Sequence, residues 1–324
     1  MHFFFCTRLV CAIMTTMNIS IEDVTKDRTP LSLWDVFLSM YYMLIFTIAV
    51  PGNALALWVF CQQKSSSPSK VFLRSLSIAD ICYVLILPMR IVYHLSDSHW
   101  PFGVILCKLS GFLFYLNMYC SIYLMGFISL DRLLAVTLPL RSQVVRKPLY
   151  ANVAVAILWT MIIGSMIPSL FSRHHQNTSA NMSVSHDECN MLYLENSTSS
   201  NALISTMVAF LLPFITIIIA YIVILLKLRT LTQHEGRPVR DKAVKMIILV
   251  VMNFLFAFAP YHICRVVYIK QIGGSLDLLR RPNQITSALT CISGVLDPMM
   301  YFFLNQAYRK TVLHLFCKTR QYGL

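Results

Sequence analysis

Seven apolar runs, each long enough to cross a bilayer, limit the folds open to this chain. A transmembrane helix needs about 20 predominantly apolar residues to cross the hydrocarbon core. The 324 residues are 57% hydrophobic and only 13% charged, whereas soluble domains carry about 25% charged residues. The pattern predicts an all-α membrane protein, a single bundle of seven transmembrane helices. The runs are Trp34–Phe60, Val71–Tyr93, Val104–Val136, Tyr150–Leu170, Ala202–Leu226, Ala243–Ile269 and Ile285–Leu304.

The connections between the runs are short, which predicts one compact bundle over residues 34–304 rather than several domains. Residues 1–33 form an N-terminal segment before it, and residues 305–324 form a tail after it. The chain shows no internal repeat of 20–50 residues. Whether translation starts at Met1 or Met17 stays open.

The tail begins with "NQAYRKTVLHLFC", which places Tyr308, Val312, Leu315 and Phe316 on one helical face. This pattern predicts a short amphipathic eighth helix that lies in the membrane interface and contacts lipid. Cys317 at its end is a candidate for palmitoylation.

Basic residues indicate the orientation of the bundle, because cytoplasmic loops carry an excess of Lys and Arg. One side of the chain holds 17 of them and the other side holds 10. This difference predicts an extracellular amino terminus. Four Asn-x-Ser/Thr glycosylation sequons fall in segments placed outside: Asn18, Asn177, Asn181 and Asn196. The net charge of +13 is therefore mostly a cytoplasmic collar facing lipid, which argues against nucleic-acid binding.

Each run also carries a short motif, and together the motifs resemble those of one family. Runs one to three contain "PGNALALW", "LSIADICYVLILP" and "SLDRLLAV", and runs six and seven contain "FLFAFAPYH" and "LDPMMYFF". Trp159 and Pro168 lie in run four, and Pro213 and Tyr221 lie in run five. In this order, the motifs resemble rhodopsin-like (class A) G-protein-coupled receptors. "HWPFG", "FLFYLNMYCSIYL" and "PYHICRVVY" resemble in particular the branch for purinergic nucleotides and lipid mediators.

The resemblance implies a multi-pass receptor of the plasma membrane that couples to a heterotrimeric G protein. It implies a disulfide between Cys107 and Cys189, which both lie on the oxidising side. It also implies that Asp80 and Asp297 face the core of the bundle. Oxygen-bearing side chains at positions matching the family's sodium pocket are Asp80, Asn117, Ser121, Ser293 and Asp297. The alternative to an allosteric Na⁺ is a protonated, water-linked hydrogen-bond network at the same residues.

The resemblance further implies an activation switch at the cytoplasmic side. Asp131 would hold Arg132 at rest and release it toward Tyr221 and Tyr301. In relatives, an acid on run six also holds the arginine of run three and so keeps the receptor inactive. This chain has Arg240 at that position, which predicts some basal activity. Proline kinks are natural hinges, and the remaining expected switch residues are Phe254, Phe258, Pro260, Asp297 and Pro298.

Two arginines, Arg90 and Arg265, lie near the outer ends of runs two and six. In hydrocarbon an arginine is expensive, and it either snorkels to the headgroups or faces the interior of the bundle. The matching positions in resembling receptors point inward, so the resemblance implies an anionic ligand held by these guanidinium forks. The other residues of the expected ligand site are Tyr93, His94, Tyr115, Tyr119, His262 and Tyr268. Snorkelling is the expectation for Arg280 and Arg281, which rim the third outer loop with Lys270.

Other ligand classes fit the sequence poorly. Phe114 stands where amine receptors carry an acid, and Cys291 stands where opsins carry their retinal lysine. The leading hypothesis is therefore a receptor for a nucleotide, a nucleotide sugar or an acidic lipid such as a cysteinyl leukotriene. The alternative is a largely constitutive or partner-modulating receptor without its own small-molecule agonist. A transporter or an enzyme is a poor fit, since the sequence has no HExxH or GxSxG motif.

Overall fold

The structure, a computed structural model, describes the helical bundle and its short connections. The described residues are 32–63, 67–138, 146–171, 189, 200–229, 237–270 and 276–321. At helix ends the side chains of 168–171, 200–202, 228–229, 237–243, 269, 276–278 and 316–321 are not described. The four sequons lie outside the described residues, as does the side chain of Cys317.

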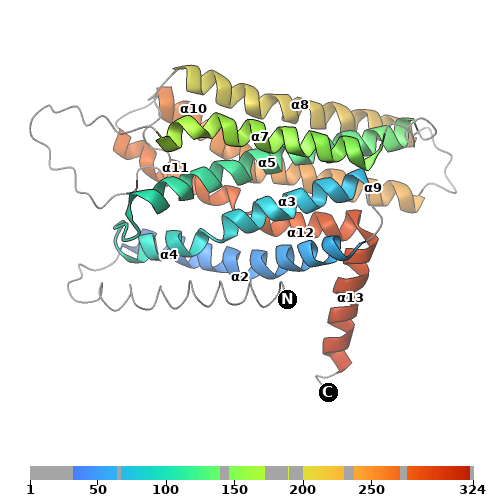
Figure 1. The fold of residues 1–324 in the computed structure, drawn as a ribbon, viewed down its shortest axis with the longest axis horizontal. Coiled ribbons are helices and arrows are strands. Elements are labelled where there is room, and N and C mark those ends of the chain that lie inside the picture. The colour runs from blue at the N-terminus through green and yellow to red at the C-terminus, as the bar shows by residue number, and fades with distance from the viewer. Residues whose placement is uncertain are drawn as a thin grey trace, which may run out of the picture.

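Seven described spans are long and apolar enough to cross a membrane, as the sequence predicts. Four are continuous helices: α2 (Leu33–Gln62), α5 (Gly103–Thr137), α7 (Pro148–Phe171) and α8 (Ser200–Arg229). Span two joins α3 (Pro68–Val84) to α4 (Leu87–Leu95), and span seven joins α11 (Leu276–Thr290) to α12 (Ser293–Leu304). Span six consists of α9 (Arg237–Asn253), η1 (Phe254–Phe258) and α10 (Ala259–Lys270). The expected eighth helix, α13 (Gln306–Gln321), turns away from the bundle (Figure 1).

Two of the interruptions coincide with prolines. Pro88 has no N–H to donate to the carbonyl of Val84, and α3 ends at Val84. In span six, the N–H of Ala259 bonds the carbonyl of Phe254, which makes one wide π-turn just before Pro260. The hinge expected from Phe254, Phe258 and Pro260 therefore coincides with an irregular turn of the backbone.

The first and seventh spans approach closely at the middle of the bundle. Pro298 has no N–H for the carbonyl of Gly294, and the side chain of Asn53 donates to that carbonyl instead (2.8 Å). Gly52 lies beside it, and a Cβ there would come within 2.9 Å of Cγ of Pro298. The "PGN" and "LDP" motifs thus meet in a single helix crossing.

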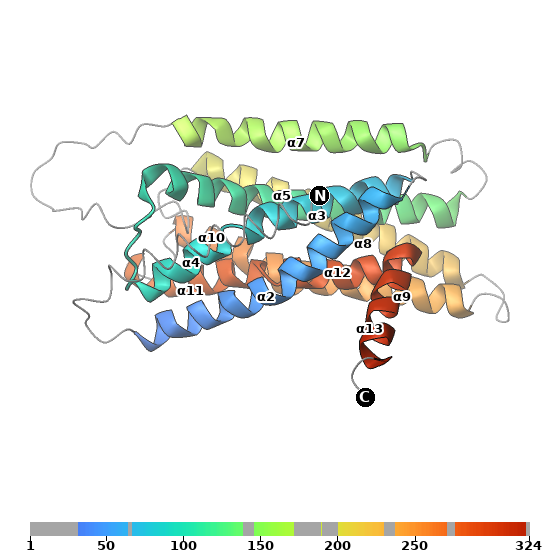
Figure 2. The same cartoon turned by 60° about the horizontal axis from the view of Figure 1, so that its bottom comes forward.

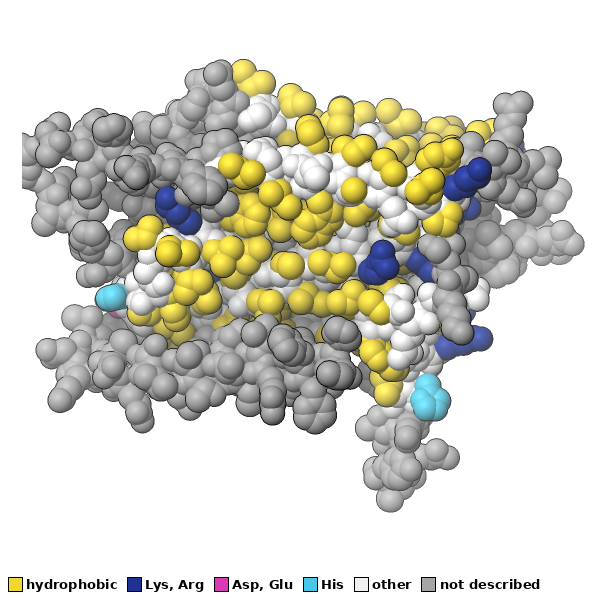
Figure 3. All heavy atoms as spheres, viewed as in Figure 1, with side chains coloured by type: hydrophobic (Ala, Val, Ile, Leu, Met, Phe, Trp, Pro, Cys, Tyr) yellow, Lys and Arg dark blue, Asp and Glu magenta, His cyan; other side chains and the backbone are white. Residues whose placement is uncertain are grey.

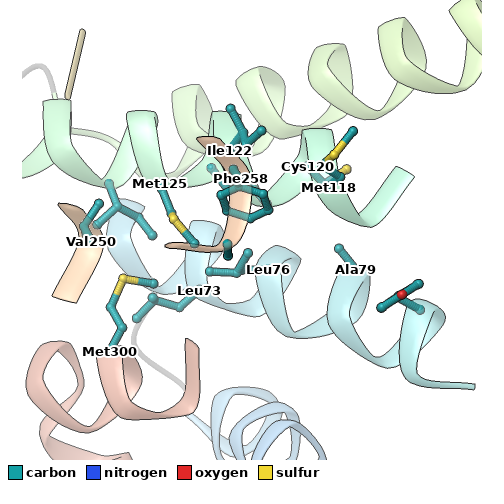
Figure 4. Packing of buried hydrophobic residues seen from close by; sticks show 14 of the residues in the cluster. Leu73, Leu76, Ala79, Met118, Cys120, Ile122, Met125, Val250, Phe258 and Met300 are labelled. Atoms are coloured by element: carbon teal, nitrogen blue, oxygen red, sulfur yellow. The ribbon is translucent and has the colours of Figure 1, made fainter. Parts of the chain in front are cut away.

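The hydrophobic core fills the space between the spans, with α7 at one edge of the bundle (Figure 2). Leu73, Met125, Val250 and Met300 point toward a common centre between α3, α5, α9 and α12 (Figure 4). On the outside, hydrophobic side chains cover the middle of the visible face, while Lys and Arg gather at its ends (Figure 3). This distribution is that of a protein whose middle lies in lipid.

The helix α13 is tied to the bundle by Tyr308. Its hydroxyl donates to the carbonyl of Gly52 (3.4 Å), and its ring packs edge-on against Tyr301 (6.0 Å). Burial raises the pKa of Tyr308 to about 12, so the phenol keeps its proton at physiological pH. The eighth helix is therefore anchored by a neutral hydrogen-bond donor.

Candidate ligand site and activation switch

Arg90 lies inside the bundle on α4 and does not snorkel to the headgroups. Its side chain is fully buried, with 0% of the residue exposed. Its guanidinium group lies over the rings of Phe114 (5.0 Å), Tyr42 (5.8 Å) and Tyr83 (5.8 Å). Nη1 also donates to the hydroxyl of Tyr42 (3.4 Å). Cation–π contacts of this kind are worth more when water is excluded.

Arg265 on α10 is the second buried cation, with 1% of the residue exposed. Its guanidinium group lies 5.5 Å from the ring centre of Tyr268. Its Nη1 has no hydrogen-bond partner among the described residues. Such an orphaned donor on a buried cation is costly unless a ligand or water completes it.

A chain of ring contacts runs from Arg90 toward the helix that carries Arg265. Phe114, under Arg90, packs edge-on against Tyr261 of α10 (5.5 Å), which lies one helical turn before Arg265. Tyr115 stacks on Tyr119 (5.8 Å), and Tyr119 in turn contacts His262 (6.2 Å). The two cations therefore share one aromatic wall, built mainly from α5 and α10.

The expected histidines have partners within the protein. Nδ1 of His94 lies 2.7 Å from Oδ1 of Asp35 on α2. Nδ1 of His262 bonds the carbonyl of Phe258 (2.8 Å), and its ring stacks on Phe210 of α8 (4.3 Å). His262 belongs to the aromatic wall, whereas His94, one turn after Arg90 on α4, contacts the ring of Tyr42 (5.8 Å).

The residues that sequence reasoning missed are Asp35, Tyr42 and Tyr83. They lie on α2 and α3, and Phe114, considered only as the place of a missing acid, turns out to contact Arg90. Asp35 stands in the first turn of α2, where an acid is an ordinary helix-capping choice. No spacing in the sequence singles out Asp35 as a neighbour of His94, or Tyr42 and Tyr83 as neighbours of Arg90.

The disulfide implied by the resemblance is present between Cys107 and Cys189, whose Cα atoms are 5.6 Å apart. It belongs to a small apolar cluster with Tyr93 and Trp100 of the "HWPFG" motif. The indole of Trp100 donates to the carbonyl of Gly103 (2.9 Å), whose φ of 74° suits a residue without Cβ. Tyr93 thus packs against the outer cluster, next to His94 (5.2 Å).

The two core acids lie fully buried in the middle of the bundle. Asn117 donates to Oδ1 of Asp80 (2.9 Å), and Tyr301 donates to Oδ2 (3.3 Å). Asn253 donates to Oδ1 of Asp297 (3.0 Å). Oδ2 of Asp297 and Oγ of Ser121 have no partner among the described residues. The fifth residue of the expected sodium site, Ser293, donates to the carbonyl of Thr290 (2.8 Å).

These groups fit a sodium ion by their chemistry. Carboxylate, amide and hydroxyl oxygens are the ligands that hard cations take. Two of the oxygens are orphaned, and two carboxylates in one dry site call for a cation or a proton. Asp80, Asp297 and Ser121 could therefore hold the ion directly.

At the opposite end of the bundle, Asp131 is the centre of a polar cluster. It accepts from Arg132 (3.0 Å) and from Ser69 (2.6 Å), and the side chains of Arg132 and Ser69 also contact each other. Arg146, just before α7, donates twice to Asp131, from Nε (2.6 Å) and Nη2 (2.9 Å). Sequence reasoning assigned no role to Arg146.

The other switch residues occupy separate positions. The hydroxyl of Tyr221 accepts from Ser129 (2.8 Å), and that of Tyr301 donates to Asp80. Phe254 and Phe258 are buried in the core. The side chains of Arg240 and Asp241 are not described. The absence of an ion pair between Arg132 and run six therefore stays a prediction.

The seven spans, the buried cations at one end and the Asp-Arg pair at the other define a rhodopsin-like membrane receptor. The chain belongs to this family: residues 52–301 match the 7 transmembrane receptor (rhodopsin family). Members of the family are multi-pass receptors of the plasma membrane and are not enzymes. This chain is likewise a multi-pass membrane receptor and not an enzyme.

Several relatives fall in the branch predicted from the motifs. The human uracil nucleotide/cysteinyl leukotriene receptor is 42% identical over 318 residues, covering 96% of this chain and 84% of that receptor. Its mouse counterpart is 45% identical over 313 residues, covering 94% of this chain and 90% of that receptor. Human cysteinyl leukotriene receptor 2 is 32% identical over 278 residues, covering 84% of this chain and 79% of that receptor.

Proposed function

We propose that this chain is a cell-surface receptor for an extracellular anionic ligand: a nucleotide, a nucleotide sugar or a cysteinyl leukotriene-like lipid. The ligand's acidic groups bind Arg90 and Arg265, and its planar or apolar part packs on the aromatic wall. Binding favours the state in which the inner half of span six moves outward about Pro260 and engages a heterotrimeric G protein.

The burial of both arginines carries this proposal. An ionised group in a low-dielectric site needs a partner of opposite charge, and a guanidinium fork matches carboxylate or phosphate. Nη1 of Arg265 is an orphaned donor, and Arg90 is surrounded by rings. The names of the relatives agree with such a ligand, since they are receptors for uracil nucleotides and cysteinyl leukotrienes.

G-protein activation in cells exposed to uracil nucleotides, nucleotide sugars and cysteinyl leukotrienes tests the proposal. Arg90→Gln and Arg265→Gln each remove a charge-assisted contact of about 1.5–3 kcal/mol, which predicts an agonist concentration for half-maximal response raised about 10–100-fold. Arg90→Lys keeps the charge but loses the fork, so an intermediate loss is expected.

Arg281→Gln is the matched control, because Arg281 is an exposed basic residue on α11 near the same end of the bundle. It should leave the response unchanged. Surface expression and thermal stability of every variant separate a lost ligand contact from misfolding. Full response of both buried-arginine variants to the active ligand would show that the anion binds elsewhere.

The cluster around Asp131 favours a second candidate, a receptor that signals largely without its own agonist. Arg146 shares the carboxylate that restrains Arg132, which leaves Arg132 less firmly held. High basal signalling that persists in the double variant Arg90→Gln/Arg265→Gln, with silence across the ligand panel, would favour this candidate. Basal signalling that is low and rises with one ligand class would reject it.

We also propose that Asp80, Asp297, Asn117, Ser121 and Ser293 hold a sodium ion in the resting receptor. The ion supplies a positive charge that offsets the two buried carboxylates. The residues come from α3, α5 and α12, so a bound ion would favour the packing of these spans. The orphaned oxygens of Ser121 and Asp297 support this proposal.

A further inference from the structure

A groove of about 660 Å³ lies between spans six and seven, and none of its lining residues is charged. On one side it is lined by Leu255, Ala259, Ile263 and Val267, and on the other side by Leu279 and Pro282. Ile263 is 65% exposed and Leu255 is 46% exposed, so the groove opens outward toward lipid. Its volume is in the range of about 300–1,000 Å³ that is usual for ligand sites.

The chemistry of the lining excludes a polar occupant. Every lining side chain is apolar apart from the thiol of Cys264, which is a weak donor. Water in such a groove would find no hydrogen-bond partners, and an unfilled groove would forfeit van der Waals contacts along its length. An apolar chain from the bilayer fits these conditions.

The length of the groove matches one leaflet. From Leu255 to Val267 the helix rises about 18 Å at about 1.5 Å per residue, while half of the hydrocarbon core is about 15 Å thick. An extended acyl chain therefore spans the groove from end to end. A lipid lying in it would bring its headgroup to the C-terminal end of α10.

A cation stands at that end. Lys270 is exposed and follows Val267 by three residues, which places it on the same face of the helix as Ile263 and Val267. Its long stem can lie along apolar surface while the ammonium group reaches the interface. No salt bridge to Lys270 is found within the described part of the chain.

We propose that this groove is a binding site for a membrane phospholipid, with one acyl chain along α10 and α11 and the phosphate on Lys270. The proposal goes beyond agonist recognition. Its binding partner is a component of the bilayer, and occupancy can be measured on the resting receptor without agonist or G protein.

The test uses the full chain in phosphatidylcholine nanodiscs containing phosphatidylcholine with a diazirine in one acyl chain. After irradiation, mass spectrometry locates the labelled peptides. Labelling at Ile263–Val267 and Leu279–Pro282 should exceed that of the exposed α7 face at Ile157 and Met161 about tenfold. It should fall as unlabelled phosphatidylcholine is added. Uniform labelling of all lipid-facing helices would overturn the proposal.

Two pairs of variants assign the parts of the site. Ala259→Phe fills the groove and should abolish the excess labelling, with Val267→Phe as a second filling variant if the first is unstable. Gly164→Phe is its control, because a Cβ added at this position of α7 meets nothing within 4 Å. Lys270→Gln should lower the excess severalfold, whereas Arg74→Gln, which removes an exposed cation of α3 away from the groove, should not.

The chemistry of the probe distinguishes a phospholipid from other apolar occupants. A photoreactive diacylglycerol with the same chains lacks the phosphate, so it should label the groove more weakly and be insensitive to Lys270→Gln. A photoreactive sterol should not compete with the phospholipid. Equal labelling by the diacylglycerol, or stronger labelling by the sterol, would contradict the assignment of a phospholipid.

Discussion

Glycine is required at position 52 for a packing reason. A Cβ there would come within 2.9 Å of Pro298 Cγ and 3.1 Å of Pro298 Cβ. The proline ring is rigid, so neither helix can relieve the overlap by a change of rotamer. The crossing of α2 and α12 has to widen instead, and the hydrogen bond from Asn53 to Gly294 lies in the same crossing.

Gly52→Ala is therefore expected to destabilise the protein by about 1–3 kcal/mol, the usual effect of overpacking a core. The control is Gly164→Ala, where the added Cβ meets nothing within 4 Å. That change should be neutral or stabilise by up to about 1 kcal/mol, since alanine favours helix. Thermal unfolding of the purified receptor measures both, and equal midpoints would show that the crossing tolerates a side chain.

Arg146 offers a second prediction for a single residue, because it competes with Arg132 for Asp131. Arg146→Gln leaves both carboxylate oxygens to Arg132 and Ser69, so we expect the basal G-protein signal to fall. Asp131→Asn weakens the restraint on Arg132, and the basal signal should rise severalfold. Measured per receptor at the cell surface, a rise in both variants would show that Arg146 restrains the resting state instead of competing.

Between elements, side chains form hydrogen bonds that join the helices, and one of these bonds satisfies a carbonyl freed by a proline. Asn53 of α2 donates to the carbonyl of Gly294 in α12, and Trp159 of α7 donates to Ser75 of α3 (2.8 Å). In hydrocarbon no water can replace such a donor, so the helix crossing depends on the side chain. The π-turn before Pro260 shows the other solution, in which the backbone itself rearranges.

Asn53→Ala should lower the free energy of unfolding by about 1–3 kcal/mol, because the carbonyl of Gly294 loses its donor. In Pro298→Ala the new N–H can bond that carbonyl within the helix. The double variant should therefore lose less than the sum of the two single variants, which a double-mutant cycle on thermal stability measures. Strict additivity would show that Asn53 does not serve the carbonyl freed by Pro298.

At the scale of the whole molecule, buried charge occupies three levels of one bundle. Arg90 and Arg265 lie near the disulfide, Asp80 and Asp297 lie in the middle, and Asp131 with its arginines lies at the far end. Spans two, three and six contribute to more than one level, so a shift of one span alters several polar sites together. This arrangement can couple ligand binding at one end to the switch at the other.

If sodium binds between Asp80 and Asp297, sodium chloride should raise the unfolding temperature relative to choline chloride at equal ionic strength. The reason is linkage: an ion bound only by the folded state adds about 2.7 kcal/mol at a concentration 100 times its dissociation constant. Asp80→Asn and Asp297→Asn should each abolish the difference. Equal unfolding temperatures in the two salts for the unmodified chain would favour the protonated network.

The seven spans, the family and the residues with special chemistry could be predicted from the sequence. Apolar length dictates a membrane helix whatever its neighbours, and prolines mark interruptions because they lack an N–H. The inward position of Arg90 and Arg265 followed from resemblance and is confirmed by their burial. The role of each site residue stays a prediction that the experiments above test.

Only the tertiary structure decided the partners. Asp35 meets His94 across 59 residues, Arg146 reaches back to Asp131, and Asn53 serves a carbonyl 241 residues away. The groove between α10 and α11 likewise depends on how two helices lie side by side. Composition fixes that a helix is buried in lipid, but its rotation and neighbours are set by packing among all seven spans, which no local pattern encodes.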